Sequence, residues 1–230
     1  MKKIFILLGA TAVIFSACNS GSGSLKSEQD SLAYAIGVDL GSYIKNVDST
    51  LNIDVVSAAI KDVLKNKSKL DQEASYAFLR EYFTVRKPAK AKKESEEFLA
   101  KVEKENKNIQ KTESGLLYEI ITPGSDVKAT GDNDTVRVMY KGELKDGKVF
   151  DSSYDRGDTA EFALNRVIKG WGEGLKLVGK GGKIKLWIPA DLAYGEQAPQ
   201  SIGPNQALVF EVELFDVMPG PAEEKKADKK

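Results

Sequence analysis

Residues 167–174 read VIKGWGEG, and mixed apolar and polar residues continue from there to Gly179. We predict one short helix over residues 171–178, ended by Gly179. Outside it the apolar period changes to two, in three runs: Val136, Val138 and Tyr140; Ile184, Leu186 and Ile188; and Leu208, Phe210, Val212 and Leu214. Such alternation is typical of antiparallel strands with one buried face, and Asp146-Gly147 indicates a hairpin turn. The C-terminal half is therefore predicted to be a curved antiparallel β-sheet packed on one short α-helix.

The preceding region, residues 27–111, has apolar residues at helical spacing and few strand-like runs. One face would carry Leu32, Ile36, Leu40 and Tyr43, and another Val56, Ile60, Val63 and Leu64. Pro88 is expected to kink or split the last helix, and the lysine- and glutamate-rich stretch after it is expected to be poorly buried. Short amphipathic helices give a small core, so we expect residues 27–110 to pair with a second copy as a homodimer. The fold class is thus α+β, with an all-α N-terminal dimerisation region.

The first residues have the features of a targeting segment. Lys2 and Lys3 precede an apolar run of about a dozen residues, shorter than the roughly twenty needed to span a bilayer. The position of Cys18 after small residues looks like a bacterial lipoprotein signal, in which residues 1–17 are removed and Cys18 is lipidated. The alternative is an ordinary secretory signal with an incidental cysteine. Either interpretation places the mature chain outside the cytoplasm, and the first anchors it to a membrane of the cell envelope.

Composition excludes several kinds of chemistry. The chain has no histidine and a single cysteine, which rules out histidine-dependent triads, histidine metal ligands and multi-cysteine zinc sites. No glycine-rich nucleotide motif is present, so we expect no metal and no cofactor. The 34 basic and 34 acidic residues balance, which gives no indication of a nucleic-acid partner. Residues 18–26 are predicted to be a flexible tether, and residues 219–230 a disordered tail.

Short strings in the C-terminal half carry a family resemblance. They are VMYKG around Tyr140, FDSS at Phe150 and Asp151, VIKGWGEG, AYG at Tyr194, and LVFEVEL around Phe210. In this order the strings resemble the FKBP-type peptidyl-prolyl cis-trans isomerases over residues 112–218. The preceding helical region, from DSLAYAIG onward, resembles the FkpA and Mip group. Members of that group are envelope isomerases that join a helical dimerisation region to a C-terminal FKBP domain.

The resemblance implies a role for each residue of a proline-binding pocket. As catalytic residues it implies Tyr140, Phe150, Asp151, Tyr194 and Phe210, and as substrate-binding residues Arg156, Val167, Ile168, Trp171 and Ile202. Trp171 would be the floor, the Ile168 N–H and the Tyr194 hydroxyl would bind substrate carbonyls, and Arg156 would pair with Asp151. Two departures put substrate preference in question: Ala160 stands where relatives often place an aromatic residue, and the loop 196–204 is slightly short.

Isomerisation needs no proton transfer. Rotation about a peptide bond costs about 18 to 20 kcal/mol because double-bond character is lost in the twisted state. The twisted amide is less polar than the planar one, so an apolar pocket that excludes water favours it. The predicted function is therefore a prolyl isomerase that assists the folding of envelope proteins, with unfolded or partly folded proline-containing chains as partners. The alternatives are a dimeric holdase with little dependence on isomerase activity, and a surface lipoprotein with a vestigial fold.

Overall fold

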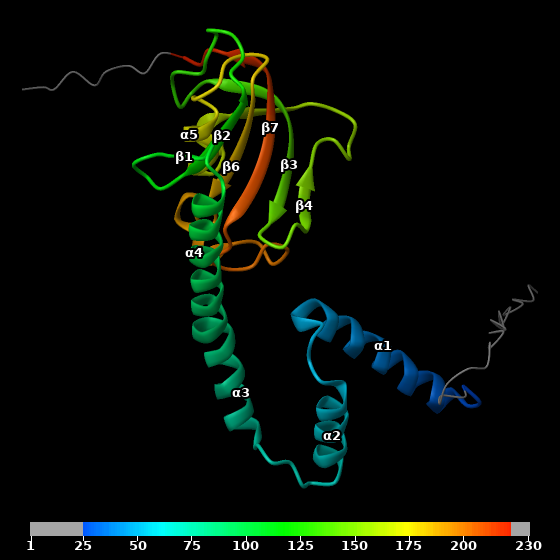
Figure 1. Cartoon of the computed structure of the whole chain (residues 1–230). Coiled ribbons are helices and arrows are strands. Elements are labelled where there is room, and N and C mark those ends of the chain that lie inside the picture. The colour runs from blue at the N-terminus through cyan, green and yellow to red at the C-terminus, as the bar shows by residue number, and fades with distance from the viewer. Residues whose placement is uncertain (1–24, 222–230) are drawn as a thin grey trace, which may run out of the picture. The chain divides into compact units, whose positions relative to one another are not determined.

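The computed structural model describes residues 25–221 (Figure 1). The predicted signal peptide, Cys18, and most of the predicted tether and tail lie outside the described residues. Contacts divide the chain into two units, Met1–Asp71 and Gln72–Lys230. Among the described residues no helix is both long and apolar enough to cross a membrane.

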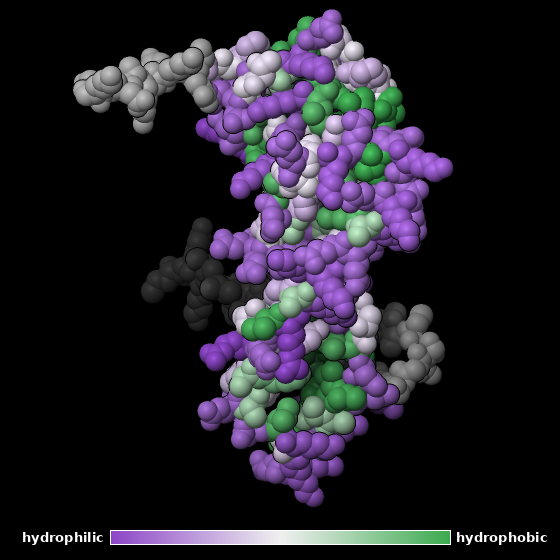
Figure 2. All heavy atoms as spheres, turned by 60° about the vertical axis from the view of Figure 1, so that its left-hand side comes forward, coloured by the Kyte–Doolittle hydropathy of each residue, from purple (hydrophilic) through white to green (hydrophobic). Residues whose placement is uncertain are grey.

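In the first unit, the described residues from 25 onward form two helices. Helix α1, Glu28–Asp48, begins with a capping box in which the Ser27 hydroxyl accepts from the Asp30 N–H and the Asp30 carboxylate accepts from the Ser27 N–H. Helix α2, Ile53–Leu64, is capped by the Asn52 side chain. Neither helix buries a residue. Their exposed apolar side chains include Leu32, Tyr34, Ile36, Val38, Tyr43, Ile53, Val55, Ile60, Val63 and Leu64, and Figure 2 shows apolar side chains at the molecular surface.

The second unit opens with a helix that continues through Pro88. Helix α3, Gln72–Glu81, passes into a π-helical turn, Tyr82–Arg86, and then into α4, Lys87–Glu105. Of the two predicted effects of Pro88, a kink or a split, the split is wrong, and the helix changes to a π-helical turn just before the proline. Proline lacks the N–H of an α-helical bond and its ring crowds the preceding turn, and the wider π-turn just before it accommodates both effects. Figure 1 shows the resulting long helix leading into the β-domain.

The β-domain is built on one seven-stranded antiparallel sheet. The strands are β1 Gln110–Lys111, β2 Leu117–Thr122, β3 Thr135–Leu144, β4 Val149–Ser152, β5 Ala160–Ala163, β6 Lys183–Ile188 and β7 Leu208–Met218. They lie in the order β1-β2-β6-β7-β3-β4, and β5 also pairs with β3. Short 3₁₀ turns at Leu164–Arg166, Ala190–Leu192 and Gly195–Gln197 join some of them. The predicted curved antiparallel sheet and all-α N-terminal region are thus confirmed.

The main core lies between one face of this sheet and helix α5, Lys169–Gly174. The alternating residues predicted to be buried on β3, β6 and β7 are all buried there. Helix α5 starts two residues before the predicted range of 171–178 and ends four residues before its end. Gly179 does not cap it: a Cβ at Gly179 would lie 1.7 Å from the Ser125 carbonyl oxygen, so close approach of the loop requires this glycine.

Two further glycines set how closely α5 approaches the sheet. A Cβ at Gly170 would lie 2.4 Å from Ile188 Cγ2, and a Cβ at Gly174 would lie 2.6 Å from Leu186 Cδ2. Because these glycines are four residues apart, they lie on the same face of the helix. Their missing side chains let the backbone of α5 rest directly on strand β6.

Helix α4 packs against a second apolar cluster. Leu117, Trp187 and Val209, from three neighbouring strands, form its buried part. Phe98, Leu99, Val102 and Ile109 pack against them. Ala91 and Ser95 on the same helix are buried as well. Most of the stretch after Pro88 is exposed, as predicted, but its few apolar residues share one helix face, and that face docks on the sheet.

Candidate active site

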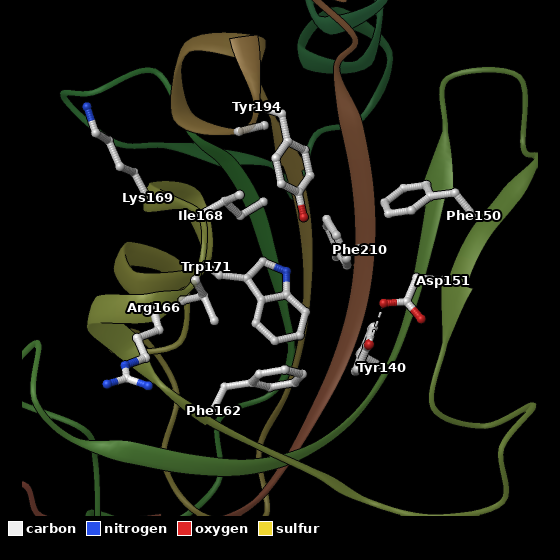
Figure 3. A pocket seen from close by; sticks show the side chains of 12 residues that line it. Tyr140, Phe150, Asp151, Phe162, Arg166, Ile168, Lys169, Trp171, Tyr194 and Phe210 are labelled. Atoms are coloured by element: carbon white, nitrogen blue, oxygen red, sulfur yellow. Dashed lines mark hydrogen bonds between the residues drawn. The ribbon is translucent and has the colours of Figure 1, made fainter. Parts of the chain in front are cut away.

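A cavity of about 490 Å³ opens between the sheet and α5 (Figure 3). Twelve residues line it: Tyr140, Phe150, Asp151, Phe162, Arg166, Val167, Ile168, Lys169, Trp171, Ala193, Tyr194 and Phe210. Strands β3, β4, β5 and β7 supply the ring-bearing walls, and α5 with the residues just before it supplies the opposite side. The lining is mostly apolar and aromatic, which is typical of a small-ligand pocket.

Trp171 lies at the centre of the aromatic residues. Its ring meets those of Tyr140, Phe162 and Phe210 edge-on, with centroids 5.0, 5.5 and 5.1 Å away. Such edge-to-face pairs fix ring orientations because the edge of one ring is attracted to the face of the next. The Trp171 indole nitrogen is buried and has no hydrogen-bond partner in the described part of the chain. Three neighbouring rings therefore fix the orientation of the Trp171 ring.

Asp151 is held at the rim by two neighbours. The Tyr140 hydroxyl donates to Oδ2 at 2.5 Å, and Arg156 Nη1 donates to Oδ1 at 2.7 Å. Arg156 Nη2 also donates to the Tyr140 oxygen at 2.9 Å, which closes a three-membered network. Partial burial alone would raise the pKa of Asp151, but the bonds from Tyr140 and Arg156 outweigh it and lower that pKa. The carboxylate is thus a fixed negative charge.

Both tyrosines of the pocket stay protonated near neutral pH. Burial raises the pKa of Tyr140, and its bond to Asp151 raises it further. Burial also raises the pKa of Tyr194, with a smaller contribution from the charge of Asp151. Figure 3 shows the Tyr194 hydroxyl pointing into the cavity, and no described side chain or backbone group bonds to it. Tyr194 therefore presents a free donor to a ligand.

Eight of the predicted site residues meet in this cavity: Tyr140, Phe150, Asp151, Val167, Ile168, Trp171, Tyr194 and Phe210. Arg156 does not line it but bonds to two residues that do. Ile202 is buried in the core at 8% exposure and does not line the cavity, so its role in substrate binding stays a prediction. The Ile168 N–H, at the start of α5, makes no hydrogen bond within the described residues. The individual roles of all these residues remain predictions.

Four lining residues were not predicted: Phe162, Arg166, Lys169 and Ala193. Phe162 supplies an aromatic wall two residues after Ala160, and it packs edge-on against Tyr140 and Trp171. Its position could have been found from the alternation along β5, because residues two apart on a strand face the same side. Arg166 and Lys169 flank the two apolar residues of VIKGWGEG and carry no pattern of their own.

The fold and the pocket together define a class of enzyme. Residues 127–215 match the family described as FKBP-type peptidyl-prolyl cis-trans isomerase, and residues 29–120 match the domain amino terminal to FKBP-type peptidyl-prolyl isomerase. The chain is 40% identical to the FKBP-type peptidyl-prolyl cis-trans isomerase FkpA of Escherichia coli K12, across 98% of this chain and 87% of that protein. It therefore belongs to the FKBP-type peptidyl-prolyl cis-trans isomerase family.

Further relatives agree with this assignment. The outer membrane protein MIP of Legionella longbeachae is 34% identical, across 94% of this chain and 97% of that protein. The crystal structure of FkpA from Escherichia coli matches with a TM-score of 0.60 at 38% identity, and the match covers 86% of this chain and all of that one. The similarity thus extends over the helical region as well as the β-domain, which confirms the predicted FkpA and Mip resemblance.

Proposed function

We propose that this enzyme isomerises prolyl peptide bonds by binding the proline ring on Trp171 and holding the amide in a water-free pocket. The observation that carries the proposal is the closed set of edge-on rings around Trp171. In such a site the planar amide loses the hydration that stabilises it, while the less polar twisted amide loses little. No residue has to abstract a proton, which agrees with a chain that contains no histidine.

Polar groups at the pocket edge would orient the substrate. The unpartnered Tyr194 hydroxyl and the Ile168 N–H are available to two substrate carbonyls. Asp151 is held in place by Tyr140 and Arg156, so its charge stays at a fixed point beside the rotating amide. Such preorganised groups act without rearranging during the reaction.

The test is catalysed cis-to-trans conversion of a short prolyl peptide by the soluble chain, measured beside Tyr194→Phe. This variant keeps the ring and removes one hydrogen bond, worth about 0.5 to 1.5 kcal/mol. We expect kcat/KM to fall about 2- to 12-fold with no change in urea midpoint, because the hydroxyl has no partner within the described chain. A wild-type rate no faster than the uncatalysed one would overturn the proposal.

We further propose a place in the bacterial envelope, as a homodimer anchored through lipidated Cys18, with unfolded proline-containing proteins as clients. The support is the apolar run before Cys18, the name of the Legionella relative, and the exposed apolar faces of α1 and α2. Helices that bury nothing within their own unit are stabilised when their apolar faces pack on a second copy. Sedimentation of the chain with and without residues 25–71 tests the dimer: a monomer in both would contradict it.

A holdase function is the second candidate, favoured by the same exposed side chains, which could bind non-native chains. The test removes residues 25–71, which form one unit. A longer deletion, of residues 25–110, would also remove α4 and expose the second apolar cluster of the β-domain. A holdase predicts that the shortened chain no longer suppresses aggregation of an unfolded protein yet isomerises peptides normally. Loss of both activities together would contradict this separation.

A further inference from the structure

Helix α4 places a buried hydroxyl against the loop that follows Tyr194. Ser95 is only 3% exposed, although its neighbours on the helix are charged. Its Oγ donates to the Asn205 carbonyl at 2.8 Å and accepts from the Ala207 N–H at 3.0 Å. Two backbone groups that are separated from Ser95 by more than 100 positions are thus satisfied by one side chain. A buried polar group with both bonds made is costly to disturb.

Asn205 connects this helix to the pocket. Its N–H donates to the Gly195 carbonyl at 2.8 Å, which closes the loop 195–205 at its base. Its side chain donates to the Pro88 carbonyl at 3.2 Å, at the start of α4. Asn205 also adopts the left-handed conformation, with φ of 53°, which asparagine tolerates better than most residues. The hydrogen bonds of Ser95 and Asn205 therefore reach the backbone of Gly195, and Gly195 directly follows Tyr194 in the chain.

The same turn of α4 reaches the opposite wall. Glu94 pairs with Lys145 in the hairpin turn between β3 and β4, with 2.5 Å between Oε2 and Nζ. The bond from Lys145 lowers the pKa of Glu94, so the pair is charged at neutral pH. Strand β4 carries Phe150 and Asp151. Adjacent residues of one helix thus bond to the 195–205 loop and to the β3–β4 turn, which adjoin two sides of the cavity lining.

We propose that Ser95 and Asn205 are positioning residues of the isomerase site: their bonds fix the 195–205 loop and thereby the place of the Tyr194 hydroxyl. The proposal rests on the proposed function only for its kinetic readout. Because α4 continues from α3, the helix that leads out of the β-domain is also part of the support of its pocket. Ser95 itself does not line the cavity, and its two bonding partners, Asn205 and Ala207, do not line it either.

The test compares Ser95→Ala with two other variants of the full chain. Ser95→Thr keeps the hydroxyl. Val102→Ala weakens the packing of α4 on the sheet at the second apolar cluster, which does not include the 195–205 loop. We expect Ser95→Ala to raise KM about 3- to 10-fold for a prolyl peptide with kcat little changed, since the aromatic floor stays intact. Ser95→Thr should restore much of this loss, and Val102→Ala should lower stability but leave KM unchanged.

Two further measurements separate positioning from general destabilisation. Adding Ser95→Ala to Tyr194→Phe should cause almost no further loss, because the first residue acts through the second. Hydrogen exchange should quicken in residues 195–207 of Ser95→Ala and not across the sheet. Additive kinetic losses, or exchange that rises equally everywhere, would overturn the proposal. If the wild type shows no isomerase activity, the proposed function fails, and the exchange pattern alone still decides whether Ser95 orders the loop.

Discussion

Gly142→Ala tests whether the aromatic walls are as tightly placed as the structure indicates. Gly142 lies on β3 opposite Phe210 of β7 and Asp151 of β4. A Cβ there would lie 2.7 Å from Phe210 Cε1 and 2.8 Å from Phe150 Cζ, well inside normal contact. Phe210 is 4% exposed and locked among other rings, so Phe150, which is only partly buried, has to move.

The change should lower both the stability of the fold and the activity of the site. Overpacking of this kind costs about 1 to 3 kcal/mol. Replacing glycine by alanine also lowers the conformational entropy of the unfolded chain, which stabilises the folded state by about 0.4 to 1 kcal/mol. The unfolding free energy should therefore fall by about 1 to 2 kcal/mol. A pocket wall displaced by about 1 Å can cost up to 100-fold in rate, so kcat/KM should fall by about 10- to 100-fold.

The measurement pairs peptide isomerisation with urea unfolding, and Gly115→Ala is the matched control. Gly115 has φ of 94°, and no atom lies within 4 Å of the position that a Cβ would take, so alanine there is strained without pressing on any neighbour. Gly115→Ala should lower the free energy of unfolding by a similar amount, about 1 to 2 kcal/mol, and leave the isomerase activity unchanged. Equal activity in the two variants would refute the reasoning, because the rings would then have absorbed the methyl without moving the wall.

Three other changes probe the pocket and its support. The isomerisation rate should be flat from about pH 5.5 to 8.5, because the pKa of Asp151 is lowered and those of Tyr140 and Tyr194 are raised, all away from neutrality; a bell-shaped profile would contradict this. Phe162→Leu should lower kcat/KM several-fold while costing less than about 1.5 kcal/mol in a melting experiment. Asp134 accepts three backbone N–H bonds, from Thr130, Gly131 and Gly220, which lower its pKa. The ionised Asp134 therefore stabilises the fold fully above its unfolded pKa of about 3.9, and this stabilisation is lost as pH falls through its folded pKa. Asp134→Asn should lower the free energy of unfolding by about 1 to 3 kcal/mol at pH 7 and by less at pH 3.

Local patterns predicted the sheet because each strand has one buried face. Alternation identified the buried residues of β3, β6 and β7, and Asp146 and Gly147 correctly indicated the turn between β3 and β4. The family resemblance, not the pattern, predicted which of these residues line the cavity. Without it, Tyr140 and Phe210 would be read as ordinary core residues, because periodicity records burial but not whether a cavity adjoins the buried ring.

What the sequence did not reveal depends on contacts between distant segments. Ser95 stands among lysines and glutamates. A serine is buried there because its hydroxyl bonds to the Asn205 carbonyl and the Ala207 N–H. The π-turn before Pro88 likewise arises from the helix continuing where proline favours a break. Hydrophobic periodicity predicts neither the burial of Ser95 nor the helix through Pro88. A serine counts as an exposed residue in such a pattern, and a proline counts as a helix breaker.

Gly170 and Gly174 of α5 place one part of the pocket under a tighter packing restriction than its rim. A Cβ at either position would press on Ile188 or Leu186 of β6, so those buried side chains, or the helix that carries Trp171, would have to shift. The rim residues Lys169 and Arg166 are exposed and are under no such restriction. Substitutions at these rim positions could therefore accumulate while the aromatic surface at Trp171 stays the same.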